Sequence, residues 1–296
     1  MEVEILEAAR WRAAVRAHEA RMAPAIEPYL ERRRTGATHP VDDFLFSYYS
    51  FRPAQLRRWH PGYGIALADA DEYAEVKGYE VDGGVARVSV AMLDARRGLL
   101  ADIRRLLIAT LQRPAQFGCF GMHEWAMVYR LDPSDTRHAS WPLRLGHDGT
   151  DRVVETHRIA CSHYDAFRFF TPPARSLNLL QPQRDDRPDF EQPGCLHAGM
   201  DLYKHAFRLA PLVDSELIAD CFDLARDIRE LDMRASPYDL SALGYEPVAV
   251  ETPEGKARYA HCQREFAQRA QPLRERLIER VDRLLTASAP VEAGRR

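Results

Sequence analysis

The sequence of 296 residues has no long hydrophobic run and few cysteines. No stretch of about 18 apolar residues occurs, so we expect no membrane partner. The first residues, MEVEILEAARW, are acidic and amphipathic and lack the basic region and apolar core of a signal peptide, which favours a cytoplasmic protein. The cysteines are odd in number and no two have Cys-x-x-Cys spacing: Cys119, Cys161, Cys195, Cys221 and Cys262. This pattern disfavours structural disulfides and a thiolate zinc cluster.

Several catalytic and nucleotide-binding motifs are also missing. Neither G-x-G-x-x-G nor G-x-x-x-x-G-K-[ST] occurs, so we expect no nucleotide cofactor. G-x-S-x-G and the E-x-x-H of ferritin-type di-iron bundles are absent. His123-Glu124 begins like the zinc-protease motif H-E-x-x-H, but Met127 stands where its second histidine would be. The formal charge of −3 gives no net attraction to phosphate backbones, so nucleic acid is a disfavoured partner.

What the sequence does contain is helical periodicity over most of its length. Residues 3–35 predict two helices meeting at a bend, because Pro24 and Pro28 interrupt the apolar pattern. Further helices are expected in VDDFLFSYYSF, in PAQLRRW, over 92–112, from Asp214 to about Met233, and from Thr252-Pro253 onward. The run YEVDGGVARVSV predicts a β-hairpin near 79–90, and RVVETHRIA is a candidate strand. We therefore expect a mainly α fold with a small β-hairpin element.

One segment indicates a division of the chain. Residues 181–193, QPQRDDRPDFEQP, contain three prolines and four acids and are typical of a loop or linker. The expected organisation is an N-terminal helical half (1–180), this linker, a C-terminal helical half (194–287) and a disordered tail (288–296). A single domain overall is the alternative.

The segment GCLHAGMDLYKHAF carries His197, Asp201 and His205 at intervals of four. On one helix the three side chains fill an arc of about 80° and face one way. Two imidazoles and a carboxylate are ligands for iron, with zinc or manganese as alternatives, and such a set leaves positions open for dioxygen. The competing interpretation is that Asp201 accepts hydrogen bonds from both histidines.

Three residues elsewhere are candidate catalytic groups. His123 and Glu124 lie in the apolar stretch GCFGMHEWAMVYR, where a charged pair needs partners. His163 lies in CSHYDAFRFF and is a candidate ligand or proton carrier. Asp165, three residues after Ser162, has the spacing of a helix N-cap.

The stretch DFLFSYYSFRPAQLRRWHPG interleaves aromatic and basic side chains. Such residues can stack a flat substrate and hold an acidic group, although a core helix with surface arginines is the competing interpretation. The candidate substrate-binding residues are Tyr48, Tyr49, Arg52, Arg57, Arg58, Trp59 and His60.

Five segments resemble an actinobacterial protein family labelled 3-methyladenine DNA glycosylase: HPVDDFLFSYYSFRPAQLRRWHPG, FGCFGMHEWAMVYR, HYDAFRFFTP, EQPGCLHAGMDLYKHAF and LDMRASPYDL. The label implies a DNA partner, a general-base carboxylate at Asp201 or Glu124, and Tyr48, Tyr49 or Trp59 stacked on a flipped base. The glycine-rich L-P-G-x-G hairpin of helix-hairpin-helix glycosylases is absent.

Asp201-x-x-x-His205 also resembles the third-helix ligands of haem-oxygenase-like di-iron oxidases. That resemblance implies further ligands from earlier helices, for which Glu27, Glu31 and Glu124 are the candidates.

The leading functional expectation is a metal-dependent enzyme, a non-haem iron oxidase or oxygenase that acts on a small acidic or aromatic substrate. A 3-methyladenine-type DNA N-glycosylase is the alternative, and a non-catalytic binding protein is the third hypothesis. The sequence indicates no oligomeric state.

Overall fold

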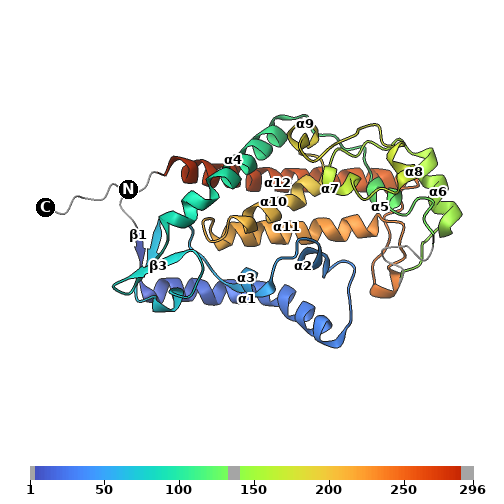
Figure 1. Cartoon of the computed structure of the whole chain (residues 1–296). Coiled ribbons are helices and arrows are strands. Elements are labelled where there is room, and N and C mark those ends of the chain that lie inside the picture. Colours follow the sequence, from blue (N-terminus) through green and yellow to red (C-terminus); the bar gives the residue numbers. More distant parts are fainter. Residues whose placement is uncertain (1–3, 133–140, 288–296) are drawn as a thin grey trace.

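The computed structural model describes residues 4–132 and 141–287 and is mainly α-helical, with one small sheet (Figure 1). This confirms the predicted fold class. The helices are α1 (Ala8–Thr35), α2 (Phe44–Tyr48), α3 (Pro53–Arg57), α4 (Val90–Gln112), α5 (Met122–Ala126), α6 (Gly146–Thr156), α7 (Tyr164–Phe167), α8 (Pro172–Arg175), α9 (Arg187–Phe190), α10 (Leu196–Arg208), α11 (Ser215–Arg234) and α12 (Pro253–Thr286), with short 3-10 turns at Asp71–Tyr73 and Ser241–Leu243.

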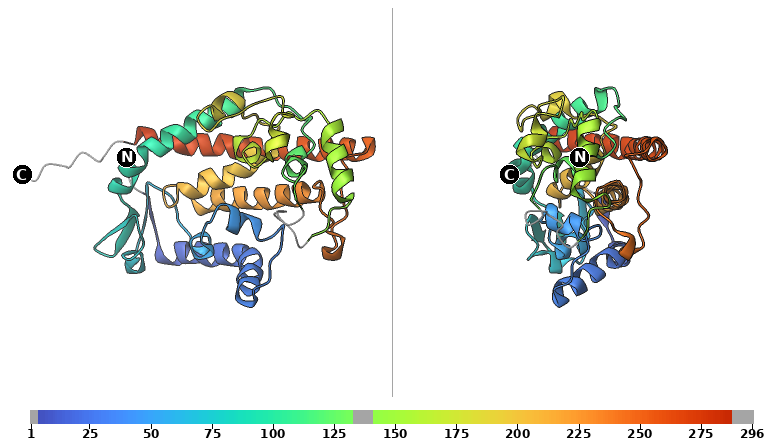
Figure 2. Two further views of the ribbon diagram at one scale, coloured as in Figure 1. Left: turned by 45° about the vertical axis from the view of Figure 1, so that its right-hand side comes forward. Right: turned by 90° about the vertical axis from the view of Figure 1, so that its right-hand side faces the viewer.

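The long helices lie in layers. Helices α10 and α11 form the middle, α4 and α12 pack together on one side, and α1 lies on the other side (Figure 2). Helix α10 also contacts α12, and a Cβ atom added to Gly199 would lie only 3.0 Å from Ile228 Cδ1. The absence of a side chain at Gly199 therefore lets α10 and α11 approach closely.

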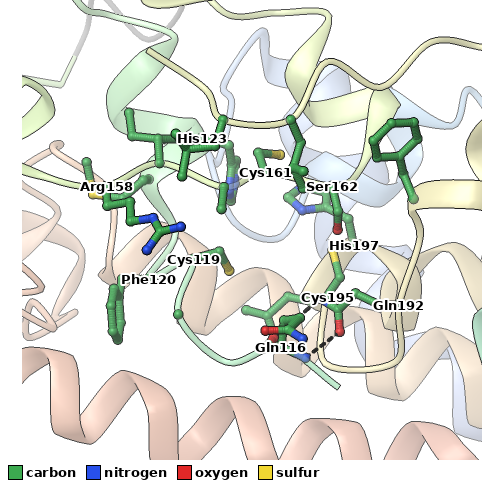
Figure 3. Close-up of a pocket in the computed structure, with 18 of the residues that line it drawn as sticks. Gln116, Cys119, Phe120, His123, Arg158, Cys161, Ser162, Gln192, Cys195 and His197 are labelled. Carbon is green, nitrogen blue, oxygen red and sulfur yellow. Dashed lines mark hydrogen bonds between the residues drawn. The ribbon is translucent and has the colours of Figure 1, made fainter. Parts of the chain in front are cut away.

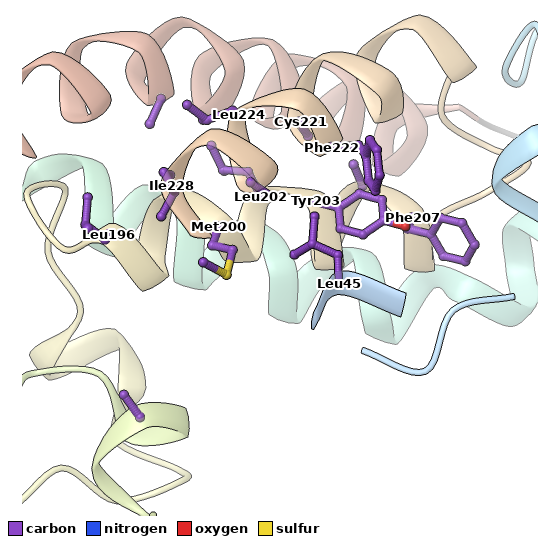
Figure 4. Close-up of a cluster of buried hydrophobic side chains, with 14 of the residues drawn as sticks. Leu45, Leu196, Met200, Leu202, Tyr203, Phe207, Cys221, Phe222, Leu224 and Ile228 are labelled. Atoms are coloured by element: carbon purple, nitrogen blue, oxygen red, sulfur yellow. The ribbon is translucent and has the colours of Figure 1, made fainter. Parts of the chain in front are cut away.

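One large hydrophobic core joins these helices. It extends in sequence from Met22 of α1 to Leu284 of α12. Figure 4 shows its centre, where Tyr203 of α10 packs near Phe222 of α11 with their ring centres 5.1 Å apart. Side chains from both 1–180 and 194–287 contribute to this core, and the intervening segment 181–193 contains α9. The predicted tail, 288–296, lies outside the described residues.

The sheet has four strands in the order β1 (Glu4–Leu6), β2 (Ile65–Leu67), β4 (Val85–Val88) and β3 (Tyr79–Asp82). Strand β1 is parallel to β2, and the other pairs are antiparallel. The β3–β4 hairpin was predicted correctly, because Gly83 and Gly84 have φ angles of 56° and 80°, which a tight two-residue turn requires. Trp11, Trp59 and Leu67 belong to a second, smaller core beside the sheet.

Two local predictions were wrong. Residues 8–35 form one helix that contains Pro24 and Pro28, not two helices, and burial of Met22 and Ile26 helps to hold it on the core. The candidate strand RVVETHRIA begins inside α6, where Val153 and Val154 are buried by packing of the helix. The predicted helix starts at Asp214 and Thr252 are confirmed, since each side chain accepts a hydrogen bond from a backbone N–H in the first turn.

Candidate metal centre and its pocket

Helix α5 holds two candidate catalytic residues inside the protein. All of its residues are buried, including His123 and Glu124. The preceding Phe120 and Gly121 both have left-handed backbone, with φ of 47° and 68°. This conformation costs a non-glycine residue such as Phe120 about 1–3 kcal/mol, so the surrounding structure must hold it. After this turn, α5 contacts the C-terminal end of α11.

Charged contacts join α5 to α11. His123 Nε2 lies 3.0 Å from Asp232 Oδ1, and Glu124 Oε1 accepts a hydrogen bond of 2.8 Å from Arg229 Nη1. The same Arg229 nitrogen donates to Asp232 Oδ2 at 3.0 Å. Burial acts to raise the pKa of Asp232, but His123, His197 and Arg229 together hold it below its ordinary value. Asp232 is therefore an anion inside the protein at neutral pH.

Helix α10 adds His197 to this pair. The ring centres of His123 and His197 are 4.4 Å apart and the rings are nearly perpendicular. Burial lowers the pKa of His197 to about 4, so its imidazole is neutral at pH 7. One ligand atom from each of His123, His197 and Asp232 lies within 4.8 Å of the other two, so this cluster could hold a metal ion.

Two atoms of this cluster lack hydrogen-bond partners in the part of the chain that the structure describes. They are His123 Nε2 and Asp232 Oδ1, both buried, and although they are 3.0 Å apart the ring N–H does not point at the oxygen. Two ligands each about 2.1 Å from one cation, at about 90° to each other, would be about 3 Å apart. Their spacing therefore fits ligands that share a cation.

A second buried cluster consists of His163, Asp165 and Asp201, and it could also hold a metal ion. Here, however, the carboxylates have cationic partners. Asp201 Oδ2 accepts hydrogen bonds of 2.9 Å from both Arg187 Nη2 and Lys204 Nζ. Lys204 also donates to Asp165 Oδ2 at 2.8 Å, and this ion pair, not a helix cap, is the main contact of the Asp165 carboxylate.

The charges around Asp201 set its protonation. Burial acts to raise the pKa of Asp201, but Lys204, His163 and Arg187 hold it well below its ordinary value. Its other oxygen accepts a hydrogen bond of 2.8 Å from Tyr49. Because both oxygens are already occupied, the second cluster has less need of a metal ion than the first.

The three ligands predicted on α10 do not meet at one point. His197 belongs to the first cluster, Asp201 to the second, and His205 to neither of these groups. The reason is the helical rise: eight residues advance about 12 Å along the axis, several times a metal–ligand bond length. His205 is buried with Nδ1 lacking a hydrogen-bond partner among the described residues, and burial lowers its pKa to about 3.

A cavity of about 870 Å³ opens beside the first cluster (Figure 3). His123 and His197 lie in its wall, together with three thiols, Cys119, Cys161 and Cys195. All five cysteines of the chain are free. Burial raises the pKa of Cys161 to about 12, so its sulfur is a neutral thiol. His197 is thus the group of this wall that is neutral and suited to bind a metal at neutral pH. Burial acts to lower the pKa of His123, but Asp232 and Glu124 hold it above its ordinary value, so a metal ion bound there would displace a proton.

The predicted substrate-binding residues do not line this cavity. Trp59 and His60 are buried near the sheet, where Trp59 Nε1 donates to Glu216 and His60 Nδ1 lies 3.1 Å from the Tyr79 hydroxyl. Arg57 forms a surface ion pair of 3.7 Å with Glu27.

The other predicted residues also lie elsewhere. Tyr48 and Tyr49 reach the second cluster, and Arg52 and Arg58 are exposed. Glu31 pairs with Arg34 on the surface of α1, so Glu27 and Glu31 are not ligands of either cluster.

Sequence reasoning missed Asp232. A signal was present, because the residue lies between Leu231 and Met233 with an arginine three positions before it, which is typical of a paired, buried carboxylate. Arg158, which lines the cavity, was missed as well.

No protein-family model, curated protein or solved structure matches the chain. Both family resemblances therefore stay predictions. No helix in the described ranges is long and apolar enough to cross a membrane.

Proposed function

We propose that the protein is a metal-dependent enzyme whose metal ion is bound by His123, His197 and Asp232 and whose substrate enters the adjoining cavity. The observation that carries the proposal is the buried contact of 3.0 Å between His123 Nε2 and Asp232 Oδ1, an ion pair in which neither atom makes a hydrogen bond within the described residues. Leaving such atoms without partners costs free energy unless something binds them. His197, at the cavity wall, supplies the third ligand.

Iron is the metal that we propose, with zinc or manganese as alternatives. Two imidazoles and one carboxylate are the ligand set of many non-haem iron oxygenases, and when bound such iron supplies chemistry with dioxygen. Arg229 fixes Asp232 through one carboxylate oxygen, and the other oxygen, which faces His123 Nε2 at 3.0 Å, would bind the metal ion. This assignment keeps the predicted oxidase or oxygenase activity and replaces two of its three predicted ligands.

We assign His163 to proton transfer. Its ring stacks on His197 with the centres 5.3 Å apart, and its Nδ1 lies 3.3 Å from Glu191 Oε1. Burial raises the pKa of Glu191 to about 7, so this carboxyl group can hold or release a proton near neutral pH. Stacked rings provide no N–H···N contact, so the proton that we assign to His163 would be exchanged with Glu191 and not with His197.

The test compares two buried aspartates. Protein purified without a polyhistidine tag is analysed for iron, zinc and manganese as wild type, Asp232→Asn, Asp201→Asn and His197→Ala. We expect about one equivalent of metal in the wild type and in Asp201→Asn, and a loss of at least about tenfold in the other two variants. Circular dichroism of each variant checks that it is folded.

Two results would overturn the assignment. If folded Asp232→Asn retained the metal, or if only Asp201→Asn lost it, the metal site would be the second cluster. No metal in the wild type after incubation with Fe(II), Zn(II) or Mn(II) would reject the metalloenzyme. If Fe(II) binds, nitric oxide serves as a probe of open coordination positions. An electron paramagnetic resonance signal of the adduct is expected in the wild type and not in Asp232→Asn.

The glycosylase alternative is tested in the same samples. Of its three predicted stacking residues, Trp59 is buried and hydrogen-bonded to Glu216, and the hydroxyl groups of Tyr48 and Tyr49 donate to Asp165 and Asp201 of the second cluster, so no observation at these residues favours it. Release of free base from alkylated DNA by metal-free protein would support a glycosylase. A protein that neither binds metal nor releases base would fit the binding-protein hypothesis.

A further inference from the structure

We propose that the cavity binds an amphipathic carboxylic acid, with the carboxylate held by Arg158 and Lys256 and the apolar part lying toward His123 and His197. The inference rests on the proposed function, because it names the substrate class of the same site. It replaces the predicted acid-binding arginines 52, 57 and 58, which lie outside the cavity lining.

Arg158 presents its guanidinium group at the cavity. It follows α6, lines the cavity and is exposed, and within the described ranges no hydrogen bond or ion pair involves its side chain. Figure 3 shows its guanidinium group reaching into the pocket toward Cys119 and above Phe120. By contrast, Arg113 at the same cavity is held by the carbonyl oxygen of Pro188 at 2.9 Å. Arg158 is therefore available to bind a ligand.

Lys256 lies close to the same point. It extends from the first turn of α12, and its Nζ is 5.9 Å from the centre of the Phe120 ring. The cavity wall thus carries three cationic side chains, at 113, 158 and 256, and one carboxylate, Asp189. This excess of positive charge attracts anions. A guanidinium fork with a neighbouring ammonium matches the two oxygens of a carboxylate.

The remainder of the wall is mixed, with more apolar than polar surface. It includes Met122, Ile159, Leu179, Leu180, Phe190 and Leu196. Leu179 is 55% exposed, so an apolar side chain stands open to solvent at this site. A cavity of about 870 Å³ is within the size range of small-molecule sites, which are mostly apolar with a few placed polar groups. The combination selects a molecule with one anionic end and a hydrocarbon or aromatic body.

Figure 3 places the two ends apart. The Arg158 guanidinium lies on the left of the view, on the side of His123, and His197 with Ser162 lies on the right, so an anion at Arg158 leaves His197 free. The carboxylate would therefore position the substrate, while its apolar part would be presented to the metal centre.

The experiment measures binding of three probes with one chain length and different end groups. Octanoate, 1-octanol and octylamine are titrated calorimetrically into the full-length wild type, whose metal content is measured in the same sample. We expect octanoate to bind about tenfold more tightly than 1-octanol, and octylamine to bind most weakly. Arg158→Gln should bring octanoate and 1-octanol to within about twofold. Arg152→Gln, an exposed arginine of the preceding helix that is not part of the cavity lining, is the matched control.

Asp232→Asn separates this inference from the proposed function. It should lose the metal and still prefer octanoate, because the anion binds at Arg158. Loss of the preference in Asp232→Asn together with its retention in Arg158→Gln would mean that the carboxylate binds the metal, and would overturn the inference while leaving the metal centre intact. Equal binding of the three probes, or no binding, would overturn it as well. Preference for octanoate in a wild type that binds no metal would keep the anion site and reject the metalloenzyme.

Discussion

Arg229 is the side chain whose removal should disturb the metal centre most without touching its ligands. It is 1% exposed, and one of its nitrogens lies 2.8 Å from Glu124 and 3.0 Å from Asp232. Its guanidinium carbon also lies 3.8 Å from the centre of the Phe44 ring. Replacing it with methionine keeps much of the volume and leaves two buried carboxylates without their shared cation.

The magnitude follows from these contacts. Removing one partner of a buried ion pair costs about 3–5 kcal/mol, because the remaining charge is left uncompensated. Loss of the cation–π contact adds about 1 kcal/mol. We expect the free energy of unfolding to fall by about 4–6 kcal/mol in Arg229→Met. For a chain of this size that corresponds to a decrease in Tm of about 10 °C.

Urea unfolding followed by circular dichroism measures the change, and Arg226→Met is the matched control. Arg226 is an exposed arginine on the same helix and should change stability by less than about 0.5 kcal/mol. The double variant Glu124→Gln with Arg229→Met should be at least about 1.5 kcal/mol more stable than the sum of the single changes predicts. A loss below about 1 kcal/mol in Arg229→Met, or additive single changes, would refute the view that this arginine compensates both carboxylates.

Two further predictions concern regions away from the pocket. Burial lowers the pKa of His60 to about 3, so between pH 6.5 and pH 3 the unfolded chain takes up a proton that the folded protein does not, and folding stability falls as the pH is lowered. The stability difference between pH 7 and pH 5 should therefore shrink by about 2 kcal/mol in His60→Gln and stay unchanged in the exposed control His261→Gln, as measured by urea unfolding at both pH values. A Cβ atom at Gly255 would clash with the Ala249 carbonyl oxygen, so Gly255→Ala should lower the free energy of unfolding by about 2–3 kcal/mol. Gly98 has open space around it in a helix, so Gly98→Ala should raise the free energy of unfolding by about 0.5–1 kcal/mol. Equal Tm values for these two variants would contradict the packing argument.

The local elements were predictable where a single short segment determines them. The hairpin follows from Gly83 and Gly84, and the start of α11 follows from Asp214, because turn and cap geometry depend on neighbouring residues. Strands β1 and β2 were not predicted, since each has three residues and exists only by pairing residues 4–6 with residues 65–67. Val153 and Val154 indicated burial correctly but not the type of element, because β-branched residues can also be buried on a helix.

The histidines of the candidate site were predictable from the sequence, but Asp232 and the grouping of the ligands were not. His123, His163 and His197 were all recognised in the sequence, and the structure places them in one continuous series of ring contacts. Their partners come from other helices, and a one-dimensional pattern does not show which neighbours a buried helix meets. The spacing of four indicated a common direction around α10, while the axial rise separated the ligands along it.

The two clusters differ in how their buried charge is balanced, and this difference predicts where a metal ion can stabilise the fold. Asp201 is compensated by two side chains of the chain, Arg187 and Lys204, and Tyr49 binds its second oxygen, whereas Asp232 has one such cation, Arg229, on one oxygen. At Asp232 one oxygen faces His123 Nε2 without a hydrogen bond, so a cation can take that place by displacing at most a proton. A metal that binds only the folded state at 100 times its dissociation constant should raise the free energy of unfolding by about 2.7 kcal/mol. We therefore expect Fe(II), Zn(II) or Mn(II) to raise the Tm of the wild type and of Asp201→Asn by at least about 5 °C and to leave the Tm of Asp232→Asn unchanged, as measured by differential scanning calorimetry. If the metal raised the Tm of Asp232→Asn and left that of Asp201→Asn unchanged, the metal site would lie beside Asp201, despite the ion pairs there.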